Sequence, residues 1–270
     1  MKNLLWFGLI FAALVLLTIS VGSAEAKIFS KDVEYSAQGV VMKGYLSYDD
    51  AIKGKRPGVL VVPEWWGLND YVRKRARMLA ELGYTALGVD MYGEGKLAAT
   101  PDDAGRLSGE VMKNADTTGV LRFMAALEFL KQQPTVDPNR IAAIGYCFGG
   151  SVVLSMAEQG ANLRGVVSFH GGLSAVIPVQ PGKVKAKVLV LTGAADKFVP
   201  PEQVETFRQQ MKAAGADFSV VSYPDATHSF TNPDADALGK KFNMPIAYNA
   251  EADSKSWDEM KTFLATVLKI

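Results

Sequence analysis

The sequence predicts an α/β domain with a mostly parallel sheet, and two observations support this fold class. Short continuous apolar runs alternate with amphipathic stretches of helical spacing through most of the 270 residues. Such runs are typical of strands that are buried on both faces of a parallel sheet. Because right-handed crossovers place the connecting helices on both faces, we expect a sheet that is covered by helices on each side.

The first expected elements are an edge hairpin, a buried strand and a helix. "VEYSAQGVVMKGYLSY", residues 33–48, alternates apolar and polar residues, which predicts an antiparallel hairpin at the edge of the sheet. "PGVLVVPE", residues 57–64, is a continuous apolar run and predicts a buried strand. A helix should follow, because Asn69 or Asp70 can cap its start and Gly83 can end it.

The rest of the chain repeats this alternation of strand and helix. Apolar runs predict strands at 84–92, 140–147, 163–172, 185–196 and in the first part of 217–230. Helical spacing predicts helices at 102–114, 117–133, 149–160, 200–215 and 249–268. The connection from His170 to Lys187 is too short for a separate cap domain, so the pocket should open to solvent.

The first 26 residues have the pattern of a secretory signal peptide. Lys2 gives a positive start, an apolar run follows from Leu4 to Ile19, and Ala24 and Ala26 form an A-x-A cleavage pattern. We therefore expect cleavage after Ala26, a single domain over 27–270, and a periplasmic or secreted protein that meets the membrane only during export. The alternative is an uncleaved N-terminal membrane anchor, although the run is shorter than the about 20 residues that cross a bilayer.

Charge and cysteine content exclude several classes of function. The chain has 29 Lys and Arg against 28 Asp and Glu, a net charge of +1, so it has no electrostatic basis for binding nucleic acid or an anionic membrane. Its single cysteine cannot form an internal disulfide, so the fold must be stable without one. Two histidines and one cysteine in separate loops do not make a recognisable metal site, and we expect neither a metal nor a cofactor.

That cysteine, Cys147, lies where a predicted strand turns into a predicted helix. The surrounding Gly145-Tyr146-Cys147-Phe148-Gly149 has the pattern of a nucleophile elbow, G-x-S-x-G, with sulfur in place of oxygen. Such a turn exposes the nucleophile above the sheet, and the N-terminal amides of the next helix favour a thiolate. The alternative is ordinary core packing, because a free cysteine is usually buried and inert.

A general base and a residue that orients it can be assigned by position. His228 lies in the loop after the last predicted strand, and Asp196 lies just past the end of the preceding strand. The order nucleophile, acid, histidine is that of the α/β hydrolases. Each residue alone could be a turn or surface residue, but all three fall at matching strand ends. His170 also ends a strand, and we expect it either to be structural or to shape the pocket.

The segment Glu64-Trp65-Trp66-Gly67 ends another predicted strand at the same edge of the sheet. The backbone N–H groups of Trp65 and Phe148 are candidate oxyanion donors. Glu64 could hold or accept the proton of the thiol, or be a solvated acid. Aromatic residues around this edge predict an apolar pocket for a small neutral acyl substrate, although each could instead belong to the core: Trp65, Trp66, Tyr92, Phe148, Phe198 and Phe230.

The chain resembles the dienelactone hydrolase family of α/β hydrolases from about Val33 to its C-terminus. The resemblance rests on "VVPEWWGLND", "GVDMYGEGK", "IGYCFGG", "SFHGG", "GAADKFVP", "YPDATHSF" and "AYNAEADSKSWDEM", in this order. It implies an α/β-hydrolase fold, Cys147 as nucleophile, His228 as base and acid, and Asp196 as its orienting partner. It also implies that Glu64 interacts with the thiol and that Trp65 and Phe148 supply the oxyanion amides.

The sequence departs from this family at two positions. Members that cleave dienelactone bind the substrate carboxylate with two arginines, and Glu94 and Asn232 stand at those places here. Because Glu94 would repel a substrate carboxylate, we expect an ester, lactone or thioester hydrolase that does not act on dienelactone. The alternative is a binding protein without catalytic activity that retains the hydrolase pocket.

Overall fold

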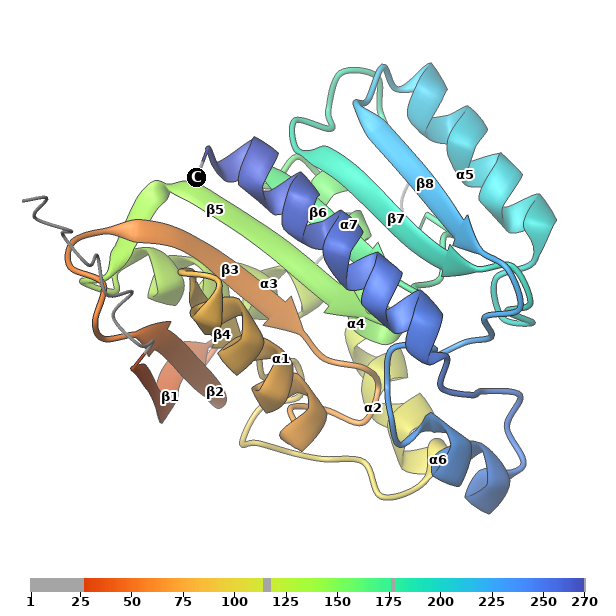
Figure 1. Ribbon diagram of the computed structural model, residues 1–270, viewed down its shortest axis with the longest axis horizontal. Coiled ribbons are helices and arrows are strands. Elements are labelled where there is room, and N and C mark those ends of the chain that lie inside the picture. Colours follow the sequence, from red (N-terminus) through yellow and green to blue (C-terminus); the bar gives the residue numbers. More distant parts are fainter. Residues whose placement is uncertain (1–26, 114–117, 176–177, 270) are drawn as a thin grey trace, which may run out of the picture.

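The computed structural model describes residues 27–113, 118–175 and 178–269, which form an eight-stranded sheet between two layers of helices (Figure 1). The expected signal peptide or anchor, residues 1–26, lies outside the described residues. The strands are β1 (Ile28–Ala37), β2 (Val40–Asp49), β3 (Arg56–Val62), β4 (Thr85–Gly88), β5 (Val136–Tyr146), β6 (Gly165–Phe169), β7 (Lys187–Gly193) and β8 (Phe218–Tyr223). The helices are α1 (Asp70–Glu81), α2 (Pro101–Lys113), α3 (Val120–Lys131), α4 (Phe148–Glu158), α5 (Pro201–Ala213), α6 (Ala235–Phe242) and α7 (Ala250–Leu268).

The sheet has the predicted antiparallel N-terminal edge. Its strand order is β1-β2-β4-β3-β5-β6-β7-β8. β2 pairs antiparallel with both β1 and β4, whereas the pairs from β4 to β8 are parallel. Six neighbouring parallel strands therefore end at one edge of the sheet, and the loops that follow them meet there.

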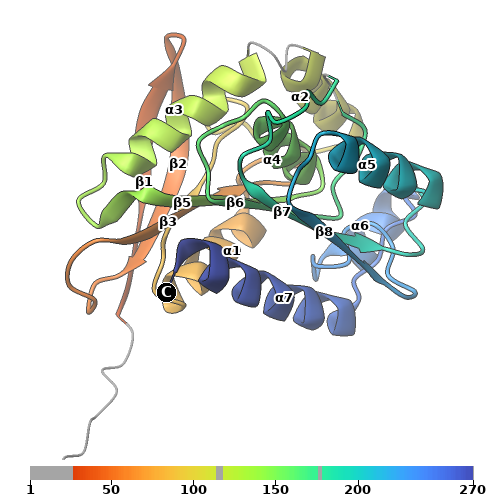
Figure 2. The ribbon, with the colours of Figure 1, turned by 90° about the horizontal axis from the view of Figure 1, so that it is seen from above.

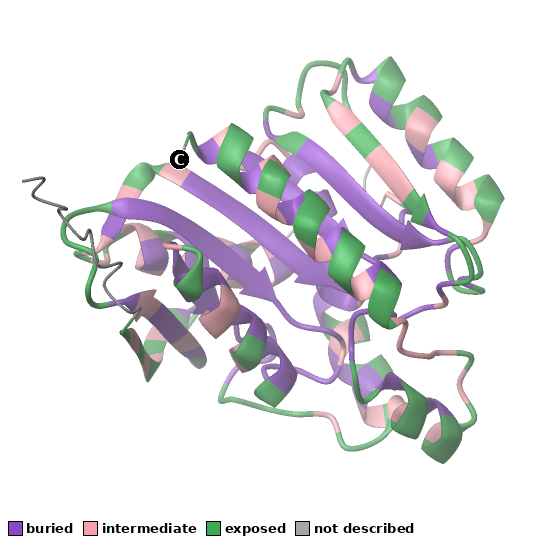
Figure 3. Ribbon diagram, in the orientation of Figure 1, coloured by how far each residue is buried: buried purple, intermediate pink, exposed green. Residues whose placement is uncertain are grey.

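Helices cover both faces of this sheet (Figure 2). α2, α3, α4 and α5 pack on one face, and α1 and α7 pack on the other. α7 shows how the pattern produces this layer, because Met260, Leu264 and Leu268 recur every four residues and are fully buried. The opposite side of α7 is exposed (Figure 3). The central strands are buried on both faces, which explains their unbroken apolar sequences.

Most predicted elements agree with the structure, and the exceptions have local reasons. Asn69, rather than Asp70, caps α1 by accepting the N–H of Val72. β5 begins at Val136, earlier than expected, because this residue pairs with Arg56 of β3. The short helix α6 was not predicted. Within the described ranges, no helix is long and apolar enough to cross a membrane.

Candidate active site

Cys147 lies at the junction of β5 and α4 in a sharply turned backbone conformation. Its φ of 52° and ψ of −117° are rare for a residue with a side chain. A Cβ atom at Gly145 would lie 2.0 Å from the carbonyl oxygen of Gly149, and one at Gly149 would lie 2.3 Å from that of Val62. Both flanking glycines are therefore required by the close approach of backbone, as the elbow pattern predicted.

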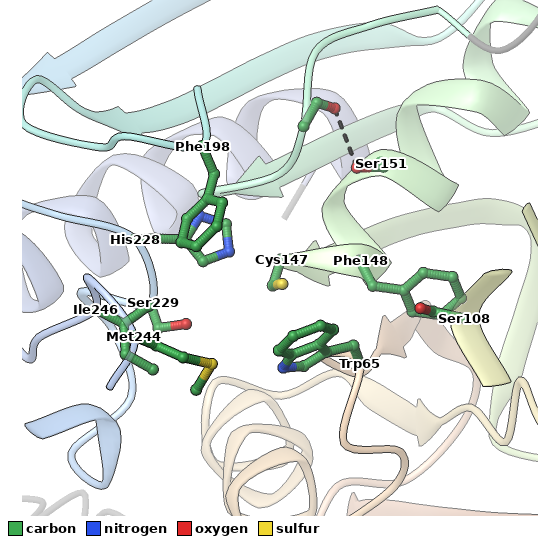
Figure 4. Close-up of a pocket in the computed structure, with 11 residues that line it drawn as sticks. Trp65, Ser108, Cys147, Phe148, Ser151, Phe198, His228, Ser229, Met244 and Ile246 are labelled. Carbon is green, nitrogen blue, oxygen red and sulfur yellow. Dashed lines mark hydrogen bonds between the residues drawn. The ribbon is translucent and has the colours of Figure 1, made fainter. Parts of the chain in front are cut away.

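Trp65 and Phe148, the two candidate oxyanion donors, lie beside Cys147. The Cys147 N–H is used in the fold, because it donates to the Phe169 carbonyl at 3.0 Å. Phe148 is the first residue of α4, so its N–H has no acceptor within the helix. Trp65 and Phe148 both line the hollow that contains the Cys147 sulfur (Figure 4). This places both predicted oxyanion residues beside the thiol.

His228 links Cys147 to Asp196. Its Nδ1 lies 2.8 Å from Asp196 Oδ2, and its ring lines the same hollow as the Cys147 sulfur (Figure 4). The other carboxylate oxygen of Asp196 accepts the N–H of Phe198 at 2.8 Å, so the carboxylate is fixed in orientation. The Phe198 ring packs against His228 at 5.1 Å between centroids. The structure thus brings the three residues together in the order sulfur, imidazole, carboxylate.

This arrangement favours the protonated form of His228. Burial disfavours the charged imidazolium, but the facing Cys147 sulfur and the hydrogen bond to Asp196 outweigh it and raise the pKa of His228 to about 10. An imidazolium beside a thiolate is a reactive pair, because the sulfur can attack while the ring holds a proton for the leaving group.

Glu64 is buried beside the pocket and is held by neighbours other than the thiol. Its two carboxylate oxygens accept hydrogen bonds from Ser229 Oγ at 2.9 Å and from Asn232 Nδ2 at 2.6 Å. Burial raises the pKa of the Glu64 carboxyl, and these two hydrogen bonds oppose that rise. Asn232, which stands at an arginine position of the family, therefore binds Glu64 and does not line the hollow around Cys147.

Neither His170 nor Phe230 lines the pocket, so the pocket role expected for Phe230 is wrong and, of the two roles open for His170, the structural one fits. Both side chains are fully buried, and their rings contact each other at 5.2 Å between centroids. His170 Nδ1 accepts the Cys147 N–H at 3.1 Å, so the ring lies behind the nucleophile elbow. Burial, and then the positive charges of His228 and Arg75, lower the pKa of His170 well below its usual value. His170 directly follows β6 and Phe230 lies in the loop after β8, and both side chains are buried in the core.

Trp66 and Tyr92 are also buried next to the pocket rather than in its wall. Trp66 stacks on Phe242 at 5.9 Å and lines a neighbouring hollow. Tyr92 donates its hydroxyl hydrogen to the Trp65 carbonyl at 2.9 Å and thereby supports the loop that carries Trp65. Of the six aromatic residues predicted to form the pocket, Trp65, Phe148 and Phe198 line the hollow that contains Cys147, and Phe198 is 51 % exposed.

The hollow around Cys147 has a volume of about 660 Å³, including space open to solvent, and a mainly apolar wall. The sequence did not reveal part of this wall: Ser108, Ser151, Gly172, Ser229, Met244 and Ile246. Met244 and Ile246 follow the unpredicted helix α6, and Figure 4 shows them beside His228. In the sequence, the only indication of their role was that both are apolar and stand shortly before the last family motif.

Charged groups are scarce in this wall. Among the described residues, no lysine, arginine or carboxylate side chain lines the hollow. Glu94 is mostly exposed, pairs with Lys96 at 3.0 Å and lies in a separate hollow. Because Glu94 does not line the hollow around Cys147, the expected repulsion between Glu94 and a substrate carboxylate does not occur there. In the described part of the chain, no three His, Cys, Asp or Glu side chains gather to hold a metal ion.

Comparisons with known proteins agree with this fold. The model of the dienelactone hydrolase family matches residues 42–268. A Salmonella typhimurium protein named "Putative carboxymethylenebutenolidase" is 34 % identical over 203 residues, covering 72 % of this chain and 75 % of that protein.

Two solved structures are similar over almost their whole length. One is a dienelactone hydrolase-like promiscuous phosphotriesterase from metagenomic libraries, with 34 % identity, a TM-score of 0.82 and coverage of 90 % of this chain and 99 % of that chain. The other, named m3DLH, has 36 % identity, a TM-score of 0.84 and coverage of 89 % and 99 %. With its α/β-hydrolase fold and this match along most of its length, the chain belongs to the dienelactone hydrolase family of hydrolases.

Proposed function

We propose that this hydrolase cleaves a small neutral ester, lactone or thioester with a Cys147–His228–Asp196 triad. The observation that carries the proposal is the position of His228, whose ring is hydrogen-bonded to Asp196 and lines the same hollow as the Cys147 sulfur. The Cys147 sulfur attacks the carbonyl carbon and forms a tetrahedral oxyanion, which the N–H groups of Trp65 and Phe148 stabilise.

The remaining steps use the same residues. His228 gives its proton to the leaving oxygen or sulfur as the bond to the carbonyl carbon breaks, which leaves an acyl thioester on Cys147. The neutral imidazole then takes a proton from water, whose oxygen attacks the thioester. The acid is released and Cys147 regains its starting state. Asp196 keeps the ring in the required orientation throughout.

The substrate class follows from the wall of the hollow. Trp65, Phe148, Phe198, Met244 and Ile246 supply apolar surface, and among the described lining residues only His228 can carry a positive charge. A substrate carboxylate would lose its hydration without gaining an arginine or lysine partner. We therefore propose a neutral acyl substrate rather than dienelactone. The reason is that the wall lacks a cationic partner for a carboxylate, and not that Glu94 repels one.

The experiment compares hydrolysis of p-nitrophenyl acetate and butyrate by residues 27–270 and by its Cys147→Ala variant under reducing conditions. We expect the parent to hydrolyse at least one ester and the variant to fall to the background rate. Removal of a triad residue typically costs on the order of 10⁴-fold or more in kcat. Equal rates in both proteins would contradict the proposal and leave a binding protein as the better account of the pocket.

A second candidate substrate is a neutral phosphotriester. The similar metagenomic protein is named as a promiscuous phosphotriesterase, and the uncharged wall of the hollow suits a triester as well as an ester. The same two proteins should be tested with a dialkyl p-nitrophenyl phosphate. Release of p-nitrophenol that depends on Cys147 would support this activity, and release at the background rate would exclude it.

We also propose export with cleavage after Ala26. The support is the positive start, the apolar run and the A-x-A pattern of residues 1–26. β1 begins at Ile28, directly after the expected new N-terminus. Expression of the full chain in a bacterium, followed by fractionation and intact-mass measurement, should give a periplasmic or secreted protein that begins at Lys27. A membrane-bound protein that retains residues 1–26 would instead indicate an anchor.

A further inference from the structure

We propose that His170 is a positioning residue that acts as a neutral hydrogen-bond acceptor for the backbone of Cys147. The inference rests on the proposed function, because it concerns the alignment of the proposed nucleophile. His170 does not reach the pocket and has no place among the lining residues. Its contact is with the backbone amide of Cys147, immediately beneath the reacting sulfur.

The hydrogen bonds determine the tautomer of His170. A backbone N–H can only donate, so His170 Nδ1, 3.1 Å from the Cys147 nitrogen, must be the unprotonated acceptor. The ring proton is therefore on Nε2, which lies 2.7 Å from Thr231 Oγ1. A second proton on Nδ1 would replace this acceptor with a donor that faces another donor. The neutral ring is thus the only form compatible with the contact.

The surrounding network holds the ring in place. The His170 backbone N–H donates to the Leu191 carbonyl at 2.8 Å, which fixes it to β7. Thr231 is held in turn, because its carbonyl accepts from Arg75 at 2.7 Å and its hydroxyl lies 2.6 Å from the Tyr71 hydroxyl. Arg75 is itself paired with Asp253. This buried network connects the nucleophile elbow to α1 and α7.

The contact is needed because the elbow is strained. Cys147 has a φ of 52° and His170 a φ of 39°, so two residues in the left-handed region face each other across β5 and β6. The Cys147 N–H shares its proton between the Phe169 carbonyl and His170 Nδ1. With the second acceptor removed, the Cys147 backbone can rotate, and the sulfur then moves out of line with His228. Small displacements of this kind lower kcat strongly.

Two substitutions separate the acceptor from the backbone strain. In His170→Asn the side-chain oxygen takes the place of Nδ1, whereas His170→Gly has no acceptor. Both residues tolerate the left-handed conformation. For each variant, kcat, KM and the pH profile of ester hydrolysis are measured, together with the rate of Cys147 alkylation by iodoacetamide and the unfolding temperature.

We expect His170→Gly to lose about 10- to 100-fold in kcat with a much smaller change in KM, and His170→Asn to recover most of this loss. The acidic limb of the kcat profile should coincide in His170→Asn and the parent, because the residue transfers no proton. Full activity in folded His170→Gly, equal losses in both variants, or a shifted acidic limb in His170→Asn would each overturn the proposal.

The alkylation rate separates this inference from the proposed function. If the parent hydrolyses no ester, the proposed function fails, but iodoacetamide still reports the alignment of Cys147 with His228. Slower alkylation in His170→Gly than in His170→Asn would then support the positioning role, and equal rates would overturn it.

Discussion

At the scale of single residues, the charge of His228 depends on Cys147. Burial opposes the imidazolium, and the Cys147 sulfur is the largest of the influences that raise the pKa of His228 to about 10. In Cys147→Ala that influence is gone, so the pKa should fall toward or below the ordinary value of about 6.5. The chain has two histidines, and burial lowers the pKa of His170 well below its usual value.

An NMR titration of the two imidazole Cε1–H signals from pH 5 to 10 measures this directly. In the parent, neither signal should move until the pH approaches the raised value for His228, and in Cys147→Ala one signal should titrate at much lower pH. If the parent also titrates near pH 6.5, the sulfur and the imidazole do not form an ion pair. This measurement does not require the protein to hydrolyse an ester.

A second residue-scale prediction concerns Asp196. In Asp196→Asn the amide oxygen can still accept the Phe198 N–H, but the negative charge that faces His228 Nδ1 is lost. We expect kcat for the ester that the parent cleaves to fall by on the order of 10²- to 10⁴-fold, since the ring loses its preferred tautomer. The unfolding temperature should change little. Retention of full activity would show that His228 is oriented by other contacts.

At the scale of elements, the β5–α4 junction depends on the absence of side chains. In Gly145→Ala the new methyl group would meet the Gly149 backbone at 2.0 Å, which cannot be relieved by a side-chain rotation. We expect the free energy of unfolding to fall by about 1–3 kcal/mol or more. Gly109, within α2, is the matched control, because nothing lies within 4 Å of its Cβ position.

The Gly109→Ala variant should be more stable than the parent by about 0.5–1 kcal/mol, as alanine is the better helix former. Urea unfolding of the parent, Gly145→Ala and Gly109→Ala measures both the expected loss and the expected gain of stability. Equal stability of Gly145→Ala and the parent would mean that the elbow can relax, and the geometric argument for the nucleophile turn would then be wrong.

The opposite end of α4 carries a buried acid, Glu158. Burial raises its pKa to about 7, from 4.5. Its raised pKa means that the free energy of unfolding falls as the pH rises from about 4.5 to about 7, because the unfolded chain loses the proton first. A carboxylate at a helix C-terminus is also unfavourable to the helix dipole.

Glu158→Gln carries no charge at any of these pH values. It should match the parent in stability near pH 4.5 and exceed it by about 1–3 kcal/mol at pH 8. Urea unfolding at both pH values is the measurement. A variant that is less stable than the parent at pH 8 would indicate that the Glu158 carboxylate has a favourable partner in the folded protein.

At the scale of the whole molecule, the sequence predicts the strands, the helices and the motifs at strand ends, because these follow from chain order and hydrophobic period. It predicts less well which way a side chain points. The elbow glycines, His228 and Asp196 come from motifs at strand ends, and the structure places them around Cys147. His170, directly after β6, and Phe230, in the loop after β8, belong to the same motifs but are buried, and spacing alone does not distinguish the two directions.

The wall formed by Met244 and Ile246 could not be predicted for a different reason. It comes from the segment between α6 and α7, which has no strong period and reaches the pocket only through the tertiary fold. The buried Arg75 left a weak signal, because it lies four residues from both Tyr71 and Leu79, on the apolar face of α1. A charge at such a position indicates a buried partner, here Asp253.

The single cysteine also gives a prediction for the whole molecule. Cys147 cannot form a bridge within its own chain, so the fold depends on packing and hydrogen bonds alone. The unfolding temperature of purified protein should therefore be the same with and without the reductant TCEP. Mild peroxide should instead remove the ester hydrolysis of the parent, because the half-buried thiol in the pocket oxidises, and TCEP should restore it while the product is a sulfenic acid. A fall of the unfolding temperature in TCEP would reveal a Cys147–Cys147 bridge between two chains, which would also block the nucleophile and link activity to oligomeric state.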